Sequence, residues 1–483
     1  MVLGNILSDL IGENMNDQAH GFNFHTMNGN LYYYNDIDGV VYLQKDRDKV
    51  TESINYRPKM DTFSQENIKL GNEIERFLRS GAYHQLTLIV TEQCNLRCLY
   101  CAYSGNYINN RTHQNKNMSW DVAEKAIRRY WEGYKLVEEI NPSFPPAIGF
   151  YGGEPLLNFS LIVRAVNFAK TLFQDKIHFN FTTNGTILTQ EMLNFLLEND
   201  FYILFSLNGD RNEHDRLRVF RDGKGSFDVL YRNLLMLRDY DSDFYFHNCG
   251  LSLTYDIGTD LQRLYDYCEN NNDILPPVSI IASVNPLFTD WYSRYSPEQI
   301  KYFEKSLTLL KNKYLTSCTK GEQPFGFLNR FFQGQYLPIF RRTENTVSTN
   351  KVFPLTASCV PGRKIAVYPN GSIHCCERIS ENFPIGNVEI GLDVDLIENI
   401  VKQYKSKIYP GCDSCPVKRL CQICFAVVAG KNSFERNPSN LCEIFFQNTK
   451  NRFIELWTML ENGAPESIFL PKQTNVDEEW YTW

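Results

Sequence analysis

The sequence has little of what membrane, secreted or nucleic-acid-binding proteins need. No apolar run approaches the roughly 20 residues of a membrane-spanning helix. The N-terminal segment MVLGNILSDLIGEN has no basic region and carries Asp9, unlike a signal peptide. Acidic and basic residues are interspersed, with 49 Lys and Arg against 56 Asp and Glu, and no basic patch indicates a nucleic-acid partner. We therefore expect a cytoplasmic protein that binds neither membranes nor nucleic acids.

Cysteine, by contrast, is abundant, with 14 residues in a chain of 483. Thiols stay reduced in the cytoplasm, so clustered cysteines there indicate metal sites. Three cysteines lie at positions 94, 98 and 101, and eight lie between Cys359 and Cys442. The sequence thus predicts two metal-bearing regions, and we expect the isolated Cys249, Cys268 and Cys318 to be small buried residues.

Two kinds of periodicity divide the chain. Residues 22–45 alternate as strands around the turns NGN and DIDG, which are hairpin signals, and a short helix is predicted over 72–80. From residue 85, short apolar strands alternate with amphipathic helices in about six units. Such repetition predicts a parallel sheet covered by helices, either doubly wound or a barrel, with ligands at the carboxyl ends of the strands.

The first cysteine motif, Cys94-x3-Cys98-x2-Cys101, lies on a loop that leaves the predicted strand LTLIV. A 4Fe–4S cubane takes four thiolates, so three cysteines would leave one iron open to a small molecule. The alternative is a zinc site completed by His84 or His113.

The segment CNLRCLYC, with the aromatic Tyr100 before its last cysteine, resembles the signature of the radical S-adenosylmethionine (SAM) superfamily. The resemblance implies that Cys94, Cys98 and Cys101 hold a 4Fe–4S cluster whose open iron chelates SAM. One electron then cleaves the sulfonium and releases a 5′-deoxyadenosyl radical, which takes a hydrogen atom from the substrate. The protein must orient these cofactors and exclude water.

Further motifs follow successive predicted strands in the order typical of this superfamily. Gly152-Gly153-Glu154-Pro155 resembles its GGEP, in which the carboxylate pairs with the SAM ammonium group. The run from Ser206 to Arg218 resembles its SxDG…HDxxR, whose serine and arginine reach the SAM ribose and carboxylate, and Asn208 replaces the usual aspartate. The predicted SAM-binding residues are Tyr100, Gly152, Gly153, Glu154, Pro155, Thr183, Asn184, Ser206 and Arg218.

The C-terminal cysteines resemble the SPASM extension of radical SAM peptide-modifying enzymes, which carries two auxiliary 4Fe–4S clusters. The spacing before Cys424 is two residues where the family has three. The fourth ligand of the inner cluster is either Cys375 or absent, in which case one iron is open to a substrate thiolate. The alternative is a zinc ribbon-like site. By the resemblance, the outer cluster takes Cys412, Cys415, Cys421 and Cys442, and the inner cluster takes Cys359, Cys376 and Cys424.

Glu377 directly follows Cys376, where some relatives in that family place a catalytic aspartate. A carboxylate beside a cluster is able to accept a proton from a substrate group, so we predict Glu377 as a catalytic residue. A solvated surface glutamate is the alternative.

The function implied by the resemblance is maturation of a ribosomally synthesised precursor peptide with a leader and a Cys-containing core. The enzyme would link a cysteine sulfur to a carbon of another residue, as sactipeptide and ranthipeptide maturases do. A flavodoxin or ferredoxin-type donor would supply electrons. The alternatives are a sulfatase-maturating enzyme that forms formylglycine, a carbon–carbon cross-linking enzyme, an iron–sulfur electron carrier and a zinc-organised peptide-binding scaffold.

We therefore expect an α/β protein with a partial (β/α)6 TIM barrel as its radical SAM core and three 4Fe–4S clusters. The predicted domains are a peptide-recognition module at 1–82, the core at 83–315, a linker at 316–358, a SPASM domain at 359–450 and a C-terminal helix and tail at 451–483. The N-terminal module would bind a leader peptide by strand addition.

Overall fold

The computed structural model describes residues 20–44, 70–142, 145–324, 326–342, 344, 360–408, 410, 412, 414–435 and 441–469. Cys359, the N-terminal segment 1–19 and the predicted tail at 470–483 lie outside the described residues.

The N-terminal hairpins form as the alternation predicts. Strands β1 (Gly21–His25), β2 (Leu31–Asn35) and β3 (Val41–Leu43) make an antiparallel sheet in the order β1-β2-β3. Gly29 and Gly39 take positive φ angles in the two turns, which glycine adopts without steric cost. The predicted helix follows as α3 (Leu70–Ser80).

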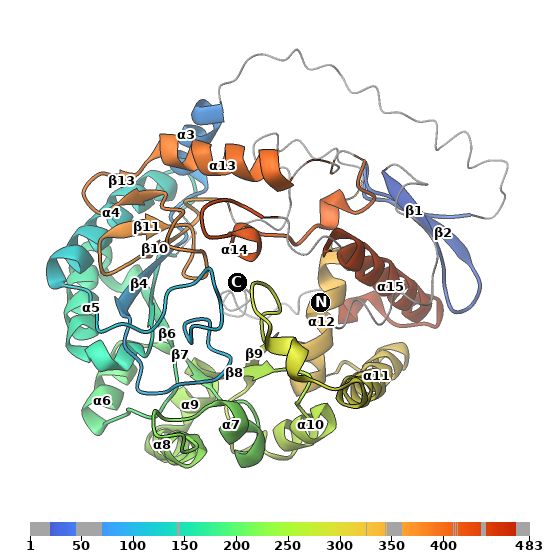
Figure 1. Cartoon of the computed structure of the whole chain (residues 1–483), viewed down its shortest axis with the longest axis horizontal. Helices are drawn as coiled ribbons and strands as arrows, with labels where there is room; N and C mark the ends of the chain where they lie inside the picture. Colours follow the sequence, from blue (N-terminus) through green and yellow to red (C-terminus); the bar gives the residue numbers. More distant parts are fainter. Residues whose placement is uncertain are drawn as a thin grey trace.

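A partial barrel of six parallel strands forms the centre of the molecule, and the prediction of a (β/α)6 core is confirmed (Figure 1). Leu86, Phe150 and Phe205 are buried on these strands because alternate residues point toward the surrounding helices. In chain order, the strands are β4 (Gln85–Thr91), β5 (Ala147–Gly152), β6 (His178–Thr183), β7 (Tyr202–Ser206), β8 (Cys249–Tyr255) and β9 (Val278–Ser283).

Several barrel helices begin at polar residues that cap their free N–H groups. Ser119, Thr189 and Asp260 each accept a hydrogen bond from a backbone N–H in the first turn of the following helix. The apolar pattern of residues 246–256 predicts a single strand, and the start of that strand is wrong. Residues 246–248 instead end a helix, because Asp241 caps that helix. The helices are α4 (Trp120–Glu138), α5 (Phe159–Phe173), α6 (Gln190–Glu198), α7 (Arg211–Leu217), α8 (Phe227–Tyr240), α9 (Ser242–Asn248), α10 (Leu261–Asn270) and α11 (Pro297–Thr319).

One described segment, Pro155–Lys176, is long and apolar enough by length and composition to cross a membrane, although the sequence suggested no such run. In the structure this segment contains α5, which packs against α4. Its residues Ile162, Ala165 and Val166 are fully buried in the main core. The buried apolar residues of this segment therefore pack into the core of the barrel.

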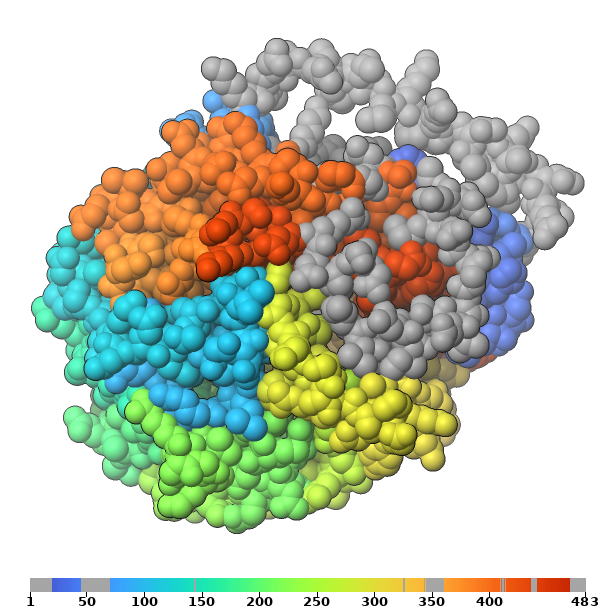
Figure 2. Space-filling view, in the orientation of Figure 1, coloured from blue at the N-terminus to red at the C-terminus, as the bar shows by residue number. Residues whose placement is uncertain are grey.

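The cysteine-rich C-terminal region extends the barrel sheet. Strand β10 (Lys364–Val367) pairs parallel to β4, and β11 (Ser372–His374), β12 (Gly386–Asn387) and β13 (Gly391–Leu392) continue antiparallel. Within the described residues, this gives one ten-stranded sheet. The orange residues 360–408 accordingly lie directly against the cyan barrel segments in Figure 2.

The remaining helices pack around this extended sheet. Helix α12 (Gly326–Phe340) falls in the predicted linker and contacts β9, α10, α11 and α15. Helix α13 (Val394–Ile408) contacts α3, and the short α14 (Phe425–Val428) follows Cys424. Helix α15 (Leu441–Glu461) begins beside Cys442 and contacts β1.

Candidate active site at the carboxyl ends of the barrel strands

The first cysteine loop crosses the carboxyl end of the barrel. It leaves β4 and pairs its backbone with the segment after α7: the Arg97 N–H donates to the Val219 carbonyl at 2.7 Å, and the Leu99 N–H donates to the Leu217 carbonyl at 2.9 Å. These bonds hold the loop beside Arg218. The structure thus brings together two motifs that lie more than a hundred residues apart.

The thiols of this loop fit an iron–sulfur cluster. Burial raises the pKa of Cys94 to about 12 and the pKa of Cys101 to about 11, so thiolates here need a bound cation. The Tyr103 N–H points at the Cys101 sulfur at 3.4 Å, and the Asn184 amide lies 3.9 Å from the Cys94 sulfur. Such N–H donors stabilise negative charge on cluster thiolates.

The two histidines of the zinc alternative lie in different places. His84 stands before β4, at the opposite end of the strand from the cysteines, and accepts a hydrogen bond from Arg363. His113 lies 3.8 Å from the Cys101 sulfur through Nε2. Among the described residues, no group of three or more His, Cys, Asp or Glu side chains is close enough to hold a single metal ion.

The Gly-Gly turn after β5 lies against the cysteine loop. The Gly153 N–H donates to the Thr91 carbonyl at 2.9 Å, and the Glu154 N–H donates to the Gln93 carbonyl at 2.8 Å. A Cβ atom on Gly152 would clash with the Thr91 carbonyl, and one on Gly153 would clash with the Gln93 carbonyl. Glycine is therefore needed for this close backbone approach.

Glu154 is a buried acceptor that joins the ends of β5 and β6. Its Oε1 accepts from the Thr183 hydroxyl at 2.7 Å and from the Leu156 N–H at 3.2 Å, and its Oε2 accepts from the Asn184 N–H at 2.8 Å. Burial raises its pKa despite these bonds. A buried carboxylate with raised pKa gains from a cationic partner, which fits the predicted ammonium group. Pro155 follows at the start of a short 3-10 turn.

The Tyr100 hydroxyl is held by Asn208 and Arg218, two residues of the segment that resembles SxDG…HDxxR. The Asn208 amide donates to the Tyr100 hydroxyl at 3.3 Å, and the Arg218 guanidinium also donates to it. Arg218 is 7% exposed, and its Nε has no hydrogen-bond partner. A buried guanidinium with a free donor fits an anionic group such as the SAM carboxylate. Ser206 ends β7 on the same side of the sheet.

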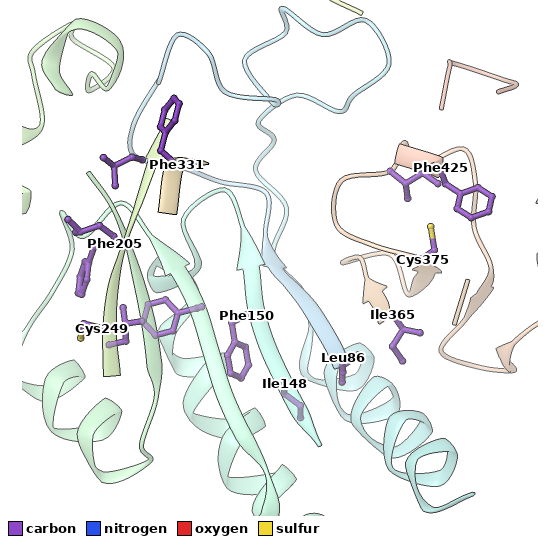
Figure 3. Close-up of a cluster of buried hydrophobic side chains, with 14 of the residues drawn as sticks. Leu86, Ile148, Phe150, Phe205, Cys249, Phe331, Ile365, Cys375 and Phe425 are labelled. Carbon is purple, nitrogen blue, oxygen red and sulfur yellow. The ribbon is translucent and has the colours of Figure 1, made fainter. Parts of the chain in front are cut away.

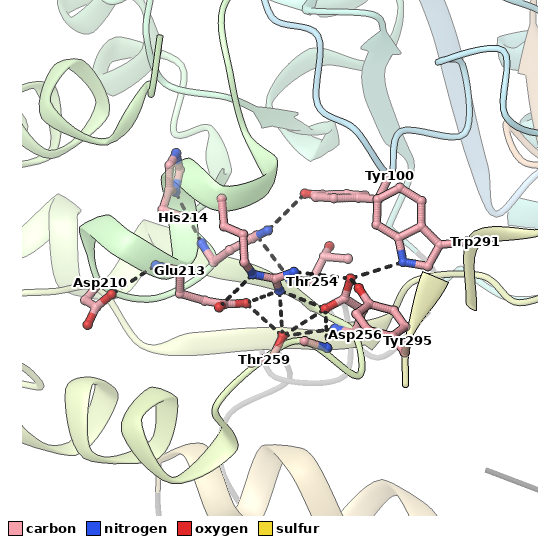
Figure 4. Close-up of polar contacts among 12 residues, drawn as sticks. Tyr100, Asp210, Glu213, His214, Thr254, Asp256, Thr259, Trp291 and Tyr295 are labelled. Carbon is pink, nitrogen blue, oxygen red and sulfur yellow. Dashed lines mark hydrogen bonds and ion pairs between the residues drawn. The ribbon is translucent and has the colours of Figure 1, made fainter. Parts of the chain in front are cut away.

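A polar network beside this site was not found from the sequence (Figure 4). The fully buried Asp256 accepts from Arg216 at 2.7 Å, from the Trp291 indole at 3.1 Å and from the Tyr295 hydroxyl. Trp291 packs near Tyr100. The network therefore joins α7, the end of β8 and the segment around Trp291. Asp256 is the last residue of the strand predicted at 246–256 and directly follows β8, and that position was the available signal.

Glu377 faces the first cysteine loop from the C-terminal region. Its carboxylate lies 2.9 Å from the Lys364 ammonium and 3.7 Å from the Arg378 guanidinium. Burial opposes its ionisation, but these two cations outweigh burial and lower its pKa. Its backbone carbonyl accepts a hydrogen bond from the Tyr103 hydroxyl at 3.2 Å. Because Glu377 is 9% exposed, the alternative of a solvated surface residue is wrong.

The predicted inner-cluster cysteines are partly described. Burial raises the pKa of Cys424, and the charge of the nearby Cys376 adds a smaller rise. Cys375 is 2% exposed and belongs to the hydrophobic core with Ile365 and Phe425 (Figure 3). Ligation by Cys375 stays a prediction, as does ligation by Cys359.

The four predicted outer-cluster cysteines lie within electrostatic reach of one another. Burial raises the pKa of Cys421 to about 12, and the proximity of Cys415, Cys412 and Cys442 adds to the rise. Four partly buried thiols match the number of donors that a 4Fe–4S cluster takes, and ligation by these cysteines stays a prediction. The isolated Cys249, Cys268 and Cys318 are buried, as predicted.

Comparison with known families agrees with this geometry. Residues 88–262 match the family described as the radical SAM superfamily. The chain carries a radical SAM domain. Such domains bind SAM and a 4Fe–4S cluster, so the match confirms the predicted radical SAM core and agrees with these two cofactors. The number of auxiliary clusters stays a prediction.

The relatives of this radical SAM chain include enzymes with different products. A cysteine-type anaerobic sulfatase-maturating enzyme of Clostridium novyi is 25% identical over 255 residues, which cover 47% of this chain and 65% of that relative. The radical SAM cyclopropyl synthase TigE of Paramaledivibacter caminithermalis is 22% identical over 363 residues, covering 74% of this chain and 69% of that relative. The chain thus spans less than two thirds of the first relative's length.

A solved structure shows the same fold. Native anSMEcpe with bound AdoMet and Cp18Cys peptide has a TM-score of 0.56 and 19% sequence identity, and the match covers 79% of this chain and 98% of that one. At this identity the likeness concerns the fold alone.

Proposed function

We propose that this chain installs a thioether cross-link in a ribosomally synthesised, Cys-containing peptide. The observation that carries the proposal is the contact between the first cysteine loop and Glu377, through the hydrogen bond from Tyr103 to the Glu377 carbonyl. This bond joins the backbone of the Cys376–Glu377 segment to the loop where SAM chemistry would occur, and the Glu377 carboxylate on that segment is buried. Peptide-bound structures among the neighbours support a peptide substrate.

The proposed reaction replaces one C–H bond and one S–H bond with one C–S bond. When bound, SAM and its cluster supply the radical that removes hydrogen from carbon, and the auxiliary clusters supply an acceptor for the remaining electron. Glu377 would accept the thiol proton, since Lys364 and Arg378 keep its carboxylate ionised. Arg218 and Glu154 would orient SAM through its carboxylate and ammonium groups.

Mass spectrometry of the reacted precursor peptide tests this proposal. We expect the product to lose about two hydrogens for each link, following from the C–H and S–H bonds lost. The linked cysteine should resist alkylation, and a Cys→Ser peptide should not be cross-linked. A loss of two hydrogens with every cysteine still alkylatable would contradict thioether formation.

Formylglycine formation is the second candidate, favoured by the sulfatase-maturating relatives. It would oxidise a Cys or Ser side chain and use the same buried carboxylate as a base. A reacted sulfatase-derived peptide that carries an aldehyde would support this candidate. Glu377→Gln should slow either product and leave SAM cleavage in the absence of peptide intact, because Glu377 acts on the peptide.

The N-terminal sheet is the proposed site for the leader of the precursor peptide. Within the described residues, β1 and β3 are its two edges, and Leu43 on β3 is 43% exposed. Strand addition at such an edge supplies affinity remote from the chemistry. Leu43→Lys should weaken binding of the precursor peptide, while Leu309→Lys, at another exposed leucine on α11, should not. Unchanged affinity in Leu43→Lys would count against recognition at β3.

The electron donor would be of the flavodoxin or ferredoxin type.

A further inference from the structure

The turn after β2 is bound to the loop that carries three of the outer-cluster cysteines. Both carboxylate oxygens of Asp36 accept from the Arg419 backbone N–H, each at 3.1 Å. The Arg419 side chain donates two hydrogen bonds to the same turn, from Nε to the Asp36 carbonyl at 3.1 Å and from Nη2 to the Ile37 carbonyl at 2.6 Å. Asp36 and Arg419 are 9% and 8% exposed, although they lie 383 positions apart.

Arg419 lies in a short 3-10 turn, Lys418–Leu420, between Cys415 and Cys421. Its backbone N–H belongs to the first turn, where such groups have no partner within the turn itself. The Asp36 carboxylate, which comes from a distant part of the sequence, accepts the hydrogen bond of this N–H group as a capping residue would. The conformation of the residues between two predicted cluster ligands therefore depends on an N-terminal side chain.

The same sheet also contacts the helix that carries the fourth cysteine. The Tyr34 hydroxyl donates to Asp36 at 2.9 Å, and the Tyr34 ring packs 4.7 Å from the ring of Phe453 in α15. Phe22 packs edge-on against Phe446 and Phe453 of that helix. The sheet thus touches both segments that carry the outer-cluster cysteines, the loop at 412–421 and the helix that begins beside Cys442.

We propose that Asp36 is a positioning residue for the outer cluster, holding the loop at 412–421 against α15 so that its cysteines and Cys442 face one iron–sulfur site. The inference rests on the proposed outer cluster and is independent of the product of the reaction. It assigns the N-terminal sheet a role in cluster retention in addition to any role in peptide binding.

Iron retention in the full-length, anaerobically reconstituted protein tests this role. Asp36→Ala should release outer-cluster iron to a chelator faster by roughly tenfold or more, as expected for residues that orient metal ligands. At completion, iron should fall from about twelve to about eight per chain, which is one cubane. The electron paramagnetic resonance signal of the outer cluster should be lost, while SAM cleavage without peptide keeps the wild-type rate. Asp36→Asn, which keeps one acceptor oxygen, should release iron at an intermediate rate and serves if Asp36→Ala does not fold.

Asp38→Asn is the matched control, because Asp38 lies in the same turn and bonds only within the sheet in the contacts described, to Asn35, Val40 and Tyr42. It should retain iron like the wild type. Equal iron retention in Asp36→Ala and the wild type would overturn the inference, as would equal loss in Asp38→Asn. Cys412→Ala gives the baseline: if the wild type holds no more iron than this variant, the proposed outer cluster itself is wrong.

Discussion

At the scale of single residues, Asn208 shows how an apparent departure from a motif is used. Its amide donates to Tyr100 through Nδ2 and accepts from the Thr254 N–H through Oδ1 at 3.2 Å. An aspartate accepts but does not donate, and its charge would lie near Arg218. The amide thus leaves the positive charge of Arg218 available to an anionic ligand.

Asn208→Asp should therefore weaken SAM binding. A carboxylate at this position would compete for Arg218, and we expect the Kd for SAM to rise roughly tenfold, equivalent to about 1.4 kcal/mol. Equilibrium binding to the reconstituted enzyme measures the change. Asn212→Asp, on the exposed side of α7, adds the same charge and should bind SAM normally. Tighter binding by Asn208→Asp would contradict this account of Arg218.

His214 predicts a specific pH dependence of stability. Burial lowers its pKa well below the usual 6.5, with a smaller contribution from the Arg218 charge. The unfolded chain binds a proton at this position near pH 6.5 and the folded chain does not, so stability is complete above that pH and falls as the pH drops through it.

His214→Gln should flatten this acid-side loss of stability. The amide oxygen of glutamine is able to accept from the Asn208 N–H, as Nδ1 does at 3.4 Å, without binding a proton. Between pH 7.5 and 5.5 the free energy of unfolding should fall less steeply than in the wild type, by up to about 1.4 kcal/mol per pH unit, and melting temperatures measured over this range should show the same flattening. His247→Gln, at an exposed histidine on α9, should keep the wild-type slope.

At the scale of elements, the N-terminal sheet and α15 share one aromatic core. Phe453 is fully buried and packs against Phe22, Phe24 and Tyr34. The sheet is therefore not a separate module attached to the barrel, because its apolar face needs the C-terminal helix for burial. The predicted domain boundary at residue 82 stays a prediction. The aromatic contacts join the N-terminal sheet to α15 near the other end of the sequence.

Phe453→Ala should destabilise both elements together. Removing a buried phenyl ring costs about 3–5 kcal/mol. Thermal unfolding should occur at a lower temperature, and limited proteolysis should cut the N-terminal sheet earlier than in the wild type. Leu309→Ala removes a side chain that is 55% exposed and should change neither measurement. Early unfolding of α15 with a protected N-terminal sheet would show that the two do not depend on each other.

At the scale of the whole molecule, the clusters should be separable. Replacing Cys94, Cys98 and Cys101 by Ala should abolish formation of 5′-deoxyadenosine, because these thiols occupy the loop at the barrel end. Iron should fall from about twelve to about eight per chain, since each cubane holds four. Iron analysis and chromatography of the cleavage product measure both effects. Continued SAM cleavage by the triple variant would exclude these cysteines as ligands.

Much of the architecture was determined by the sequence itself. Alternating βα periodicity predicted about six parallel strands, and the capping residue Ser119 marked the start of one helix, because capping and amphipathicity act over a few neighbouring residues. The position of each motif after a strand followed from that order, since the carboxyl ends of parallel strands lie on one side. The cysteine spacing likewise indicated metal before any contact was known.

Only the tertiary structure decided which distant groups meet. The pairing of β10 with β4, the bond from Tyr103 to Glu377 and the contacts of Asp36 with Arg419 join segments that are hundreds of residues apart. The choice of such partners depends on how whole elements pack, and no local pattern records it. For the same reason, the sequence did not predict the buried Asp256 network, because its members Arg216, Trp291 and Tyr295 lie far from Asp256 in the sequence and meet it only in the fold.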